Sequence, residues 1–193
     1  GDNRNQTFNI YTGSGRNGKS KLVELMALVL GDYKGSVPLA LITQKRGSIG
    51  GVSPEISQLK GLRYAVMQEP SKGAKLNEGI MKELTGGDKI QARGLFKDPI
   101  EFKPQWKIVL TSNVLPQVNA NDRGTWRRIR QVDFVSEFVD EEDYNQKTAQ
   151  GLVGDKEKPI YKKDSNLKDK LPNWIKVFTA ILIEKVNETG GFV

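Results

Sequence analysis

Neither cysteine nor histidine occurs among the 193 residues of the sequence. Without cysteine there are no disulfides, no thiol nucleophile and no cysteine-ligated zinc, which is compatible with a reducing cell interior. Without histidine, a general base has to be a carboxylate, and a metal site has no imidazole ligand. Any metal ion would therefore be bound by oxygen atoms, the ligands that Mg²⁺ prefers.

Long apolar runs are also missing. A membrane-spanning helix needs roughly 18 or more apolar residues in a row. The longest apolar stretch, Leu22 to Leu30, is shorter than that and contains Glu24. The sequence shows no secretory signal and starts at Gly1 instead of methionine, which indicates a piece of a larger protein. We therefore expect an intracellular protein that is not secreted and has no membrane partner.

The charge balance is positive, with 30 Lys and Arg against 23 Asp and Glu and a formal net charge of +7. Such a balance favours a polyanionic partner such as nucleic acid, although a basic surface that only faces water has the same composition. The chain is long enough for one full domain with its own core and short for two.

A phosphate-binding loop is the clearest motif. Residues 13–20 read GSGRNGKS, which matches the pattern G-x-x-x-x-G-K-[ST]. The β-branched and aromatic run from Thr7 to Thr12 predicts a strand before the loop. The apolar run after it predicts a helix over about Lys19 to Leu30 that ends at Gly31. A strand, this loop and a helix in that order are the context in which the motif binds nucleotides.

Each part of the loop has an expected task. Gly13 and Gly18 allow a tight turn that points backbone N–H groups at phosphates, and the positive end of the following helix faces the same anion. Lys19 is expected to reach the β- and γ-phosphates of ATP, and Ser20 to ligate Mg²⁺. The residues predicted to contact the nucleotide are Gly13, Ser14, Gly15, Arg16, Asn17, Gly18, Lys19, Ser20 and Lys21. The alternative is a chance match in a glycine-rich loop.

The rest of the chain alternates helices with short apolar strands, which predicts an α/β fold with a mainly parallel sheet. The expected strands are Leu62 to Met67, Lys107 to Ser112 and Arg128 to Phe134, and the expected helices are Pro54 to Leu62, Asn77 to Thr85 and Leu171 to Asn187. The segment DKIQARGLFKDPIEFKP has two β-like halves around a turn, so we expect a hairpin over about residues 88–103. From residue 140 to about 170 the chain is polar and lysine-rich, with little core.

Polar residues follow two of the expected strands. Glu69 comes after the strand that ends at Gln68, and Asn113 comes after the strand that ends at Ser112. Ligands bind at the carboxyl ends of parallel strands. Glu69 is therefore the candidate to polarise a water molecule and hold Mg²⁺, and Asn113 the candidate to orient that water. The alternatives are a solvated acid and an ordinary turn residue.

Arginines are concentrated in the segment NDRGTWRRIRQVDF, which contains Arg123, Arg127, Arg128 and Arg130. An arginine supplied by a neighbouring subunit can stabilise the charge of a phosphoryl group in transfer. The alternative for any one of the four is that it simply faces water at the start of a strand.

In this order, five segments together resemble superfamily 3 helicases: GSGRNGKS, RYAVMQEP, LNEGIMKELTGGDKIQARGLFKDPIEFKP, KIVLTSNVLP and WRRIRQVDF. The sequence looks closest to the poxvirus-type primase-helicases of large DNA viruses and their phage and plasmid relatives. The similarity runs from about Tyr11 to Phe134, and the closing DSNLKDKLPNWIKVF resembles the tail of the same domain.

The resemblance implies a P-loop NTPase of the AAA+-like type, with the hairpin inserted as a channel loop and a helical C-terminal portion. Residues 1–139 would form the ATPase core, and residues 140–193 the polar linker and helical portion of the same helicase domain. The resemblance also implies a homo-hexameric ring that hydrolyses ATP with Mg²⁺ at its subunit interfaces, moves along single-stranded DNA and unwinds forked DNA in the host cytoplasm or nucleus. Primase activity would belong to another region of the parent protein.

Residue roles in the nucleotide site follow from the same resemblance. Lys19 and Ser20 match the lysine and serine of the family's phosphate loop. Glu69 matches the acidic end of the second motif, and Asn113 matches the polar sensor. Many relatives have two adjacent acids in the second motif, whereas this sequence has Gln68 before Glu69. This departure leaves Glu69 as the only carboxylate of that motif.

Other roles concern neighbouring subunits and DNA. Arg127 looks like the finger that reaches into the adjacent subunit, and Arg128 is the rival assignment. Lys82 lies where the family often places a basic residue that senses the neighbour's nucleotide. Phe96 and Lys97 resemble the tip that grips DNA, and they offer an aromatic face for bases and a cation for phosphate, as a single-strand tracker needs.

Two other functions use the same loop. A nucleotide or small-molecule kinase would bury its acceptor within one subunit and would have no use for a basic hairpin. A nucleotide-gated DNA-binding module with weak hydrolysis would account for Gln68. Measurable turnover would exclude the module, and DNA-stimulated turnover would exclude the kinase.

Overall fold

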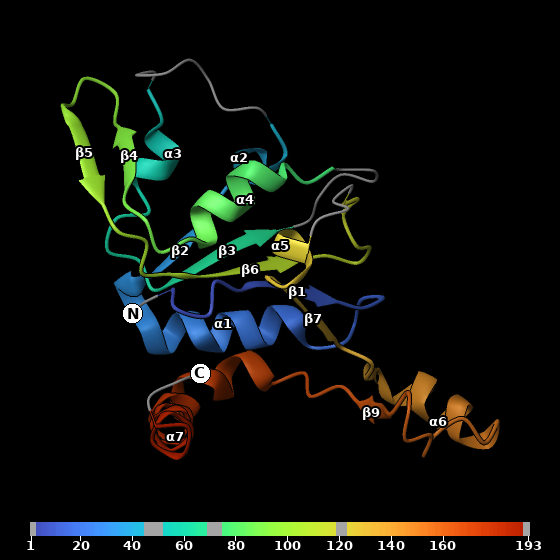
Figure 1. The fold of residues 1–193 in the computed structure, drawn as a ribbon. Helices are drawn as coiled ribbons and strands as arrows, with labels where there is room; N and C mark the ends of the chain where they lie inside the picture. Colours follow the sequence, from blue (N-terminus) through green and yellow to red (C-terminus); the bar gives the residue numbers. More distant parts are fainter. Residues whose placement is uncertain (1–2, 45–51, 69–74, 119–122, 191–193) are drawn as a thin grey trace. The chain divides into compact units, whose positions relative to one another are not determined.

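The computed structural model describes residues 3–44, 52–68, 75–118 and 123–190. Its central sheet has the strand order β2-β3-β6-β1-β7, and all four neighbouring pairs are parallel. The strands are β1 (Phe8–Thr12), β2 (Lys34–Ser36), β3 (Tyr64–Gln68), β6 (Lys107–Thr111) and β7 (Ile129–Asp133). The prediction of an α/β fold with a mainly parallel sheet is confirmed (Figure 1).

The chain folds as two compact units. The first comprises residues 1–15 and 32–134, and the second comprises residues 16–31 and 135–193. The phosphate loop therefore begins in the first unit and ends in the second. Residues 16–31 pack with the C-terminal segment, although the sequence places them in the predicted core of residues 1–139.

The core of the first unit lies on one face of the sheet, where the helices α2 (Ala40–Thr43) and α4 (Glu78–Thr85) cover it (Figure 1). Phe8 and Trp106 are almost completely buried there. Trp106 also donates its indole N–H to the carbonyl oxygen of Leu84 at 3.1 Å, which ties β6 to the end of α4. Burying such large apolar side chains is the main force that stabilises this unit.

Helix α4 begins where its sequence predicts. The side chain of Asn77 caps it by accepting a hydrogen bond from the backbone N–H of Ile80 at 3.3 Å. Its apolar residues recur at helical spacing, so Ile80, Met81 and Leu84 face the core together. The same helical spacing places Lys82 away from the side of the helix that faces the core.

The predicted hairpin is confirmed. β4 (Ile90–Arg93) pairs antiparallel with β5 (Pro99–Phe102). Ile90, Ala92 and Phe102 are buried at its base, and α3 (Pro54–Ser57) lies beside β4. The turn extends away from the central sheet (Figure 1).

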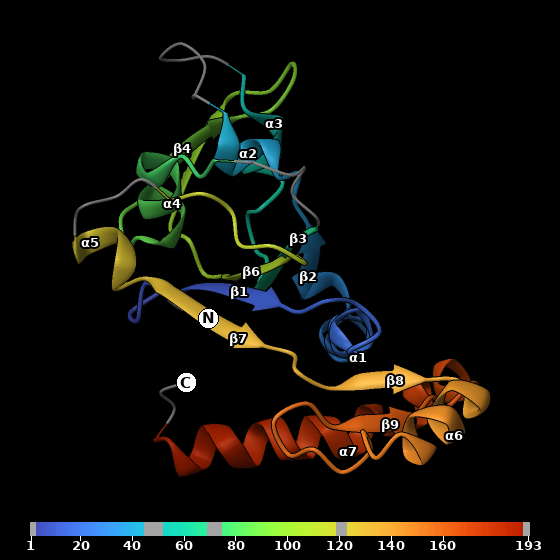
Figure 2. The ribbon, with the colours of Figure 1, turned by 90° about the vertical axis from the view of Figure 1, so that its right-hand side faces the viewer.

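The second unit contains two long helices, α1 (Lys19–Leu30) and α7 (Leu167–Glu188), which pack against each other. The strands β8 (Glu137–Val139) and β9 (Ile160–Lys162) form a parallel pair, and α6 (Glu141–Ala149) lies beside β9 (Figure 2). The 3-10 turn η1 (Gly31–Tyr33) begins at the last residue of the first segment of this unit and continues into the first unit, which also contains α5 (Arg123–Trp126).

Several sequence predictions need correction. The helix expected over Pro54 to Leu62 is the single turn α3, because Gly61 adopts a φ of 89° and turns the chain before β3. Helix α7 begins at Leu167, four residues before the expected start, and contains Pro172. The polar stretch after residue 140 holds α6 and β9, which the sequence analysis did not predict because neither has a regular apolar face.

The helices in the described part of the chain include none that is both long enough and apolar enough to cross a membrane.

Candidate functional site

Three strands of the first unit end at the same edge of the sheet. Thr111 of β6 lies opposite Gln68 of β3 on one side and Tyr11 of β1 on the other. Beyond β6, the backbone N–H of Ser112 still bonds to the carbonyl oxygen of Tyr11 at 3.0 Å. Asn113 comes next and is exposed at this edge. The structure therefore brings Asn113 to the carboxyl ends of the strands, as its position in the sequence predicts.

A polar contact that the sequence analysis missed holds the end of β1. The hydroxyl of Thr12 donates to the carboxylate of Asp133 on β7, and the amide of Gln131 donates to the same oxygen at 2.7 Å. These two hydrogen bonds, that from Gln131 first, lower the pKa of Asp133. The contact fixes the last residue of β1 immediately before the phosphate loop begins.

The phosphate loop has the backbone that its glycines predict. Gly13, Gly15 and Gly18 have φ values of 142°, 97° and 86°, and Arg16 has a φ of 48°. Glycine adopts positive φ without a steric penalty, whereas an arginine there is uncommon. Loops that mix positive and negative φ values can point successive N–H groups toward one side, as anion-binding nests do.

The loop leads directly into α1. Gly18 is the N-cap residue of this helix and has no side chain with which to cap it. The first turn of α1, all of which the structure describes, contains no acidic residue. The positive end of the helix dipole is therefore not offset within its own first turn. Lys19 is only 7% exposed, and its ammonium donates to the side-chain oxygen of Asn17 at 3.2 Å. Ser20 is exposed beside it.

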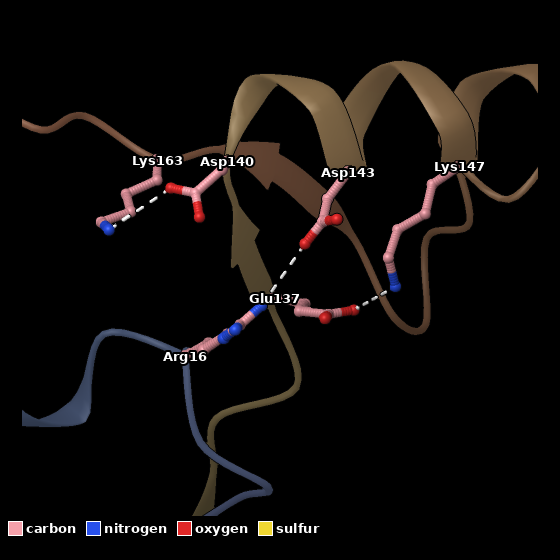
Figure 3. A network of polar contacts seen from close by, with 6 residues as sticks. All are labelled: Arg16, Glu137, Asp140, Asp143, Lys147 and Lys163. Carbon is pink, nitrogen blue, oxygen red and sulfur yellow. Dashed lines mark hydrogen bonds and ion pairs between the residues drawn. The ribbon is translucent and has the colours of Figure 1, made fainter.

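Arg16 joins the loop to β8 and α6 within the second unit. Its carbonyl oxygen accepts a hydrogen bond from the N–H of Phe138 at 2.7 Å, and its guanidinium lies 3.5 Å from the carboxylate of Asp143 (Figure 3). Two further ion pairs surround this contact, Lys147 with Glu137 and Lys163 with Asp140. Exposed pairs of this kind contribute about 0–1 kcal/mol each, so they orient the loop more than they stabilise the fold.

A cavity of about 360 Å³ in the first unit brings together two basic residues for which the sequence predicts contacts with the nucleotide of a neighbouring subunit. Lys82 and Arg128 both line it. Arg128 is half-buried and donates to the carbonyl oxygen of Gly124 at 2.6 Å and to the side-chain oxygen of Gln6 at 2.9 Å. Arg127 is exposed and donates to that same oxygen of Gln6.

The hairpin tip presents an aromatic ring to solvent. Phe96 is 97% exposed and has a φ of 54°, and Lys97 beside it is exposed as well. The Nε of Arg93 donates to the carbonyl oxygen of Lys97 at 3.1 Å, which braces the turn. On the arm, Lys89 donates to Glu101 at 2.8 Å, and that hydrogen bond raises the pKa of Lys89.

The predicted Mg²⁺ ligands are only partly described. Glu69 lies outside the described residues, so its role stays a prediction. Ser20 offers one exposed oxygen, the type of ligand that Mg²⁺ takes. Within the described ranges, no group of three or more acidic side chains could hold a metal ion by itself. Phosphate oxygens of a bound nucleotide commonly supply further ligands to Mg²⁺ in such loops.

Comparison with known families gives one match. A family described as "Family of unknown function (DUF5906)" matches residues 11–128. The matched segment begins in β1 and includes the phosphate loop, the hairpin and the paired arginines.

Named proteins that are similar to this chain come from large DNA viruses. A provisionally named helicase, L207/L206 of Acanthamoeba polyphaga mimivirus, is 41% identical over 185 residues, which cover 95% of this chain and 19% of that protein. The provisionally named helicase 022R of Frog virus 3 is 36% identical over 72% of this chain and 15% of that protein. The provisionally named primase C962R of African swine fever virus is 31% identical over 70% of this chain and 14% of that protein. The chain thus spans a fifth or less of these relatives.

Solved structures support the fold. Two apo structures of the C-terminal region of NrS-1 match with TM-scores of 0.59 and 0.58, at 13% and 14% sequence identity. They cover 91% and 90% of this chain, and the chain covers 36% and 35% of theirs. At this identity the likeness extends to the arrangement of helices and strands.

Proposed function

The chain belongs to the DUF5906 family, whose function is unknown, and we propose that it is the ATP-hydrolysing motor of a superfamily 3 DNA helicase from a large DNA virus. The names of its viral relatives support a role in DNA replication. The observation that carries the proposal is the phosphate loop. The loop contains residues with positive φ and leads into the N-terminus of α1, which has no side-chain cap. Lys19, the first residue of that helix, is buried.

Phosphate binding is the first task of this loop. The N–H groups of residues 13–18 and the N-terminus of α1 attract the β- and γ-phosphates of ATP. Lys19 adds a full positive charge, and its burial strengthens the attraction because little water screens it. Asn17 fixes the ammonium through the hydrogen bond between their side chains. Bound Mg²⁺ would neutralise part of the phosphate charge, with Ser20 among its ligands.

Hydrolysis needs an oriented water and a cation that stabilises the transferred phosphoryl group. In this proposal Asn113 orients the water from the edge of the sheet, and Glu69 polarises it. Arg127 supplies the cation to the nucleotide of an adjacent subunit, because it is exposed and therefore able to reach a neighbour. Lys82 and Arg128 line the same cavity. This position suits a residue that senses the nucleotide of the adjacent subunit.

DNA contact is assigned to the hairpin. A base can stack on the exposed ring of Phe96, and the ammonium of Lys97 can bind the neighbouring phosphate. Neither contact depends on base sequence, which suits movement along single-stranded and forked DNA. A homo-hexameric ring would place six such tips around the strand. Any primase activity belongs to another region of the parent protein, and the site of action is the host cytoplasm or nucleus.

The test is steady-state ATP hydrolysis at high protein concentration, with and without single-stranded DNA. We expect hydrolysis that rises with DNA and that falls at least about 100-fold in Lys19→Ala, since a buried cation at a transition state contributes on that scale. Lys60→Ala, which removes an exposed lysine, is the matched control and should hydrolyse ATP as the wild type does.

Other outcomes would contradict the motor. Lysine-dependent hydrolysis that ignores DNA would favour a kinase. ATP binding without hydrolysis, at concentrations where the chain has assembled, would favour a nucleotide-gated binding module in which Gln68 weakens the reaction.

A further inference from the structure

A cavity of about 340 Å³ lies against the phosphate loop within the second unit, and the proposed function gives it no task. Its lining residues come from the phosphate loop and α1, from β8 and the residue after it, from the segment after β9, and from the start of α7. The lining residues that matter here are Arg16, Gly18, Lys21, Phe138, Leu167 and Lys168. The volume falls at the lower end of the range for small-molecule sites, about 300–1,000 Å³.

The apolar part of this cavity is formed by the aromatic ring of Phe138, and two contacts hold this residue in place. Phe138 stacks on Tyr161 with ring centroids 5.6 Å apart and an angle of 28° between the planes. The backbone N–H of Phe138 is fixed by its bond to Arg16. Phe138 remains 36% exposed in spite of this stacking. Leu167 adds a second apolar surface at the start of α7.

The ring lies within contact distance of the phosphate loop. A Cβ atom built on Gly18 would come 3.5 Å from Cε2 of Phe138, which is ordinary van der Waals contact. A nucleotide held at residues 13–18 therefore has an apolar, stackable surface directly beside its phosphates. This distance is fixed inside one compact unit, because Gly18 and Phe138 both belong to it.

The rim of the cavity is polar. Lys163 lies 3.4 Å from Asp140, and Lys170 pairs with Asp164. The carboxylates of Asp140 and Asp164 both line the cavity and are hydrogen-bond acceptors, so they can receive the N–H groups of a base edge. A purely phosphate-binding cavity would need no apolar wall and would place no carboxylates on its rim.

We propose that this cavity binds the purine base of the nucleotide whose phosphates occupy the loop, with Phe138 as the stacking surface and Leu167 as a second apolar contact. The inference rests on the proposed function, because it requires a nucleotide at residues 13–20. Base–aromatic stacking in proteins makes a substantial and sequence-tolerant contribution to binding. Phe138 is therefore a binding residue that the sequence motif, which ends at Ser20, does not include.

The experiment compares two ligands that share phosphates and differ in the base. Binding of ATP and of inorganic tripolyphosphate is measured by calorimetry for the wild type and for Phe138→Ala, Phe138→Tyr and Leu152→Ala. We expect Phe138→Ala to bind ATP about tenfold or more weakly while its affinity for tripolyphosphate stays within twofold, as estimated from typical stacking contributions. Phe138→Tyr keeps the ring and should bind both ligands normally. Leu152 is an exposed apolar residue of the same unit outside the cavity, so Leu152→Ala should also bind both normally.

A fluorescent base gives a second measurement that does not depend on affinity. At saturating concentration, the triphosphate of 2-aminopurine riboside should lose fluorescence on binding to the wild type and keep more of it on Phe138→Ala. This comparison also detects a variant that has lost its fold, because such a variant would bind neither tripolyphosphate nor the probe.

Each other result has a distinct meaning. Equal loss of ATP and tripolyphosphate binding in a folded Phe138→Ala variant would overturn the base site, since Phe138 would then only shape the loop. Unchanged ATP binding in Phe138→Ala, with loss of both ligands in Lys19→Ala, would overturn the base site and leave the proposed function standing. Absence of any binding by the wild type would overturn both.

Discussion

Arg127 and Arg128 donate to the same acceptor, the side-chain oxygen of Gln6. Arg128 has a second bond to the carbonyl oxygen of Gly124 and is half-buried, so it is held in place. Arg127 is exposed and has the shared contact with Gln6. The two arginines thus differ in what they can do: Arg128 is suited to shape the cavity that it shares with Lys82, and Arg127 is suited to reach outward.

The first prediction separates the two arginines. Arg127→Ala should lower kcat for ATP hydrolysis at least about 100-fold, because arginine fingers contribute on this scale or more. Its affinity for ATP should stay within about twofold, because the phosphate contacts of the loop are intact. Kinetics and calorimetry on the same preparation measure both quantities. Arg130→Ala, within the adjoining strand β7, is the control and should keep kcat.

Mixing variants tests whether Arg127 acts on a neighbour. Lys19→Ala and Arg127→Ala subunits are each inactive alone, yet an interface between them can combine an intact loop with an intact finger. We therefore expect activity to return when the two are mixed. No return, or a larger loss in Arg128→Ala than in Arg127→Ala, would contradict the assignment.

The second prediction concerns Gln6 as a positioning residue. Gln6→Ala removes the shared acceptor and should lower kcat about tenfold without changing ATP affinity, because a misplaced cation loses part of its transition-state interaction. Gln6→Glu keeps an acceptor oxygen and should restore kcat. A stability effect alone would reduce activity in both variants, so thermal unfolding is measured alongside.

The third prediction concerns the hairpin. Phe96→Ala and Lys97→Ala should each weaken binding of single-stranded DNA severalfold and reduce DNA-stimulated hydrolysis, while hydrolysis without DNA stays the same. Loss of the Lys97 phosphate contact should also lower the slope of log affinity against log salt by about 0.7. Lys89→Ala is the matched control on the same hairpin, because Lys89 is already paired with Glu101. Equal effects of Lys89→Ala and Lys97→Ala would mean that the hairpin contributes only general charge.

The fourth prediction uses Tyr64, a residue that is 5% exposed and whose buried hydroxyl interacts with that of Tyr11. Burial first, and then the nearby Tyr11, raises the pKa of Tyr64 above its ordinary value of 10.0. The folded state therefore favours the neutral ring. Its contribution to stability is complete below pH 10 and is lost as the pH rises further, by up to about 1.4 kcal/mol per pH unit.

Tyr64→Phe should accordingly match the wild type at pH 7 within about 1.5 kcal/mol, because at most the one hydrogen bond with Tyr11 is lost. Above pH 10 the variant should be the more stable of the two, as measured by urea unfolding. Parallel pH curves for wild type and Tyr64→Phe would contradict the prediction.

Much of the fold could be predicted because its signals are local. The alternation before Gly13 and the glycines after it encode β1 and the loop within a dozen residues, and the hairpin follows from two β-like halves around one turn. The elements between residues 140 and 170 were missed. Their side chains are mostly polar and exposed, so they give no regular apolar period to detect.

The sequence by itself determined the elements whose signals lie within a few residues: the strand, loop and helix around Lys19, the hairpin tip at Phe96 and the polar residue after β6. Only the tertiary structure decided which distant residues meet. Gln6 and Arg128 are 122 positions apart, and Arg16 and Asp143 are 127 apart. Such contacts depend on the order of strands in the sheet and on the packing of separate segments, and no local periodicity records either. For that reason the loop could be recognised in the sequence, whereas the contact that Arg127 and Arg128 share with Gln6 and the cavity beside Phe138 could not.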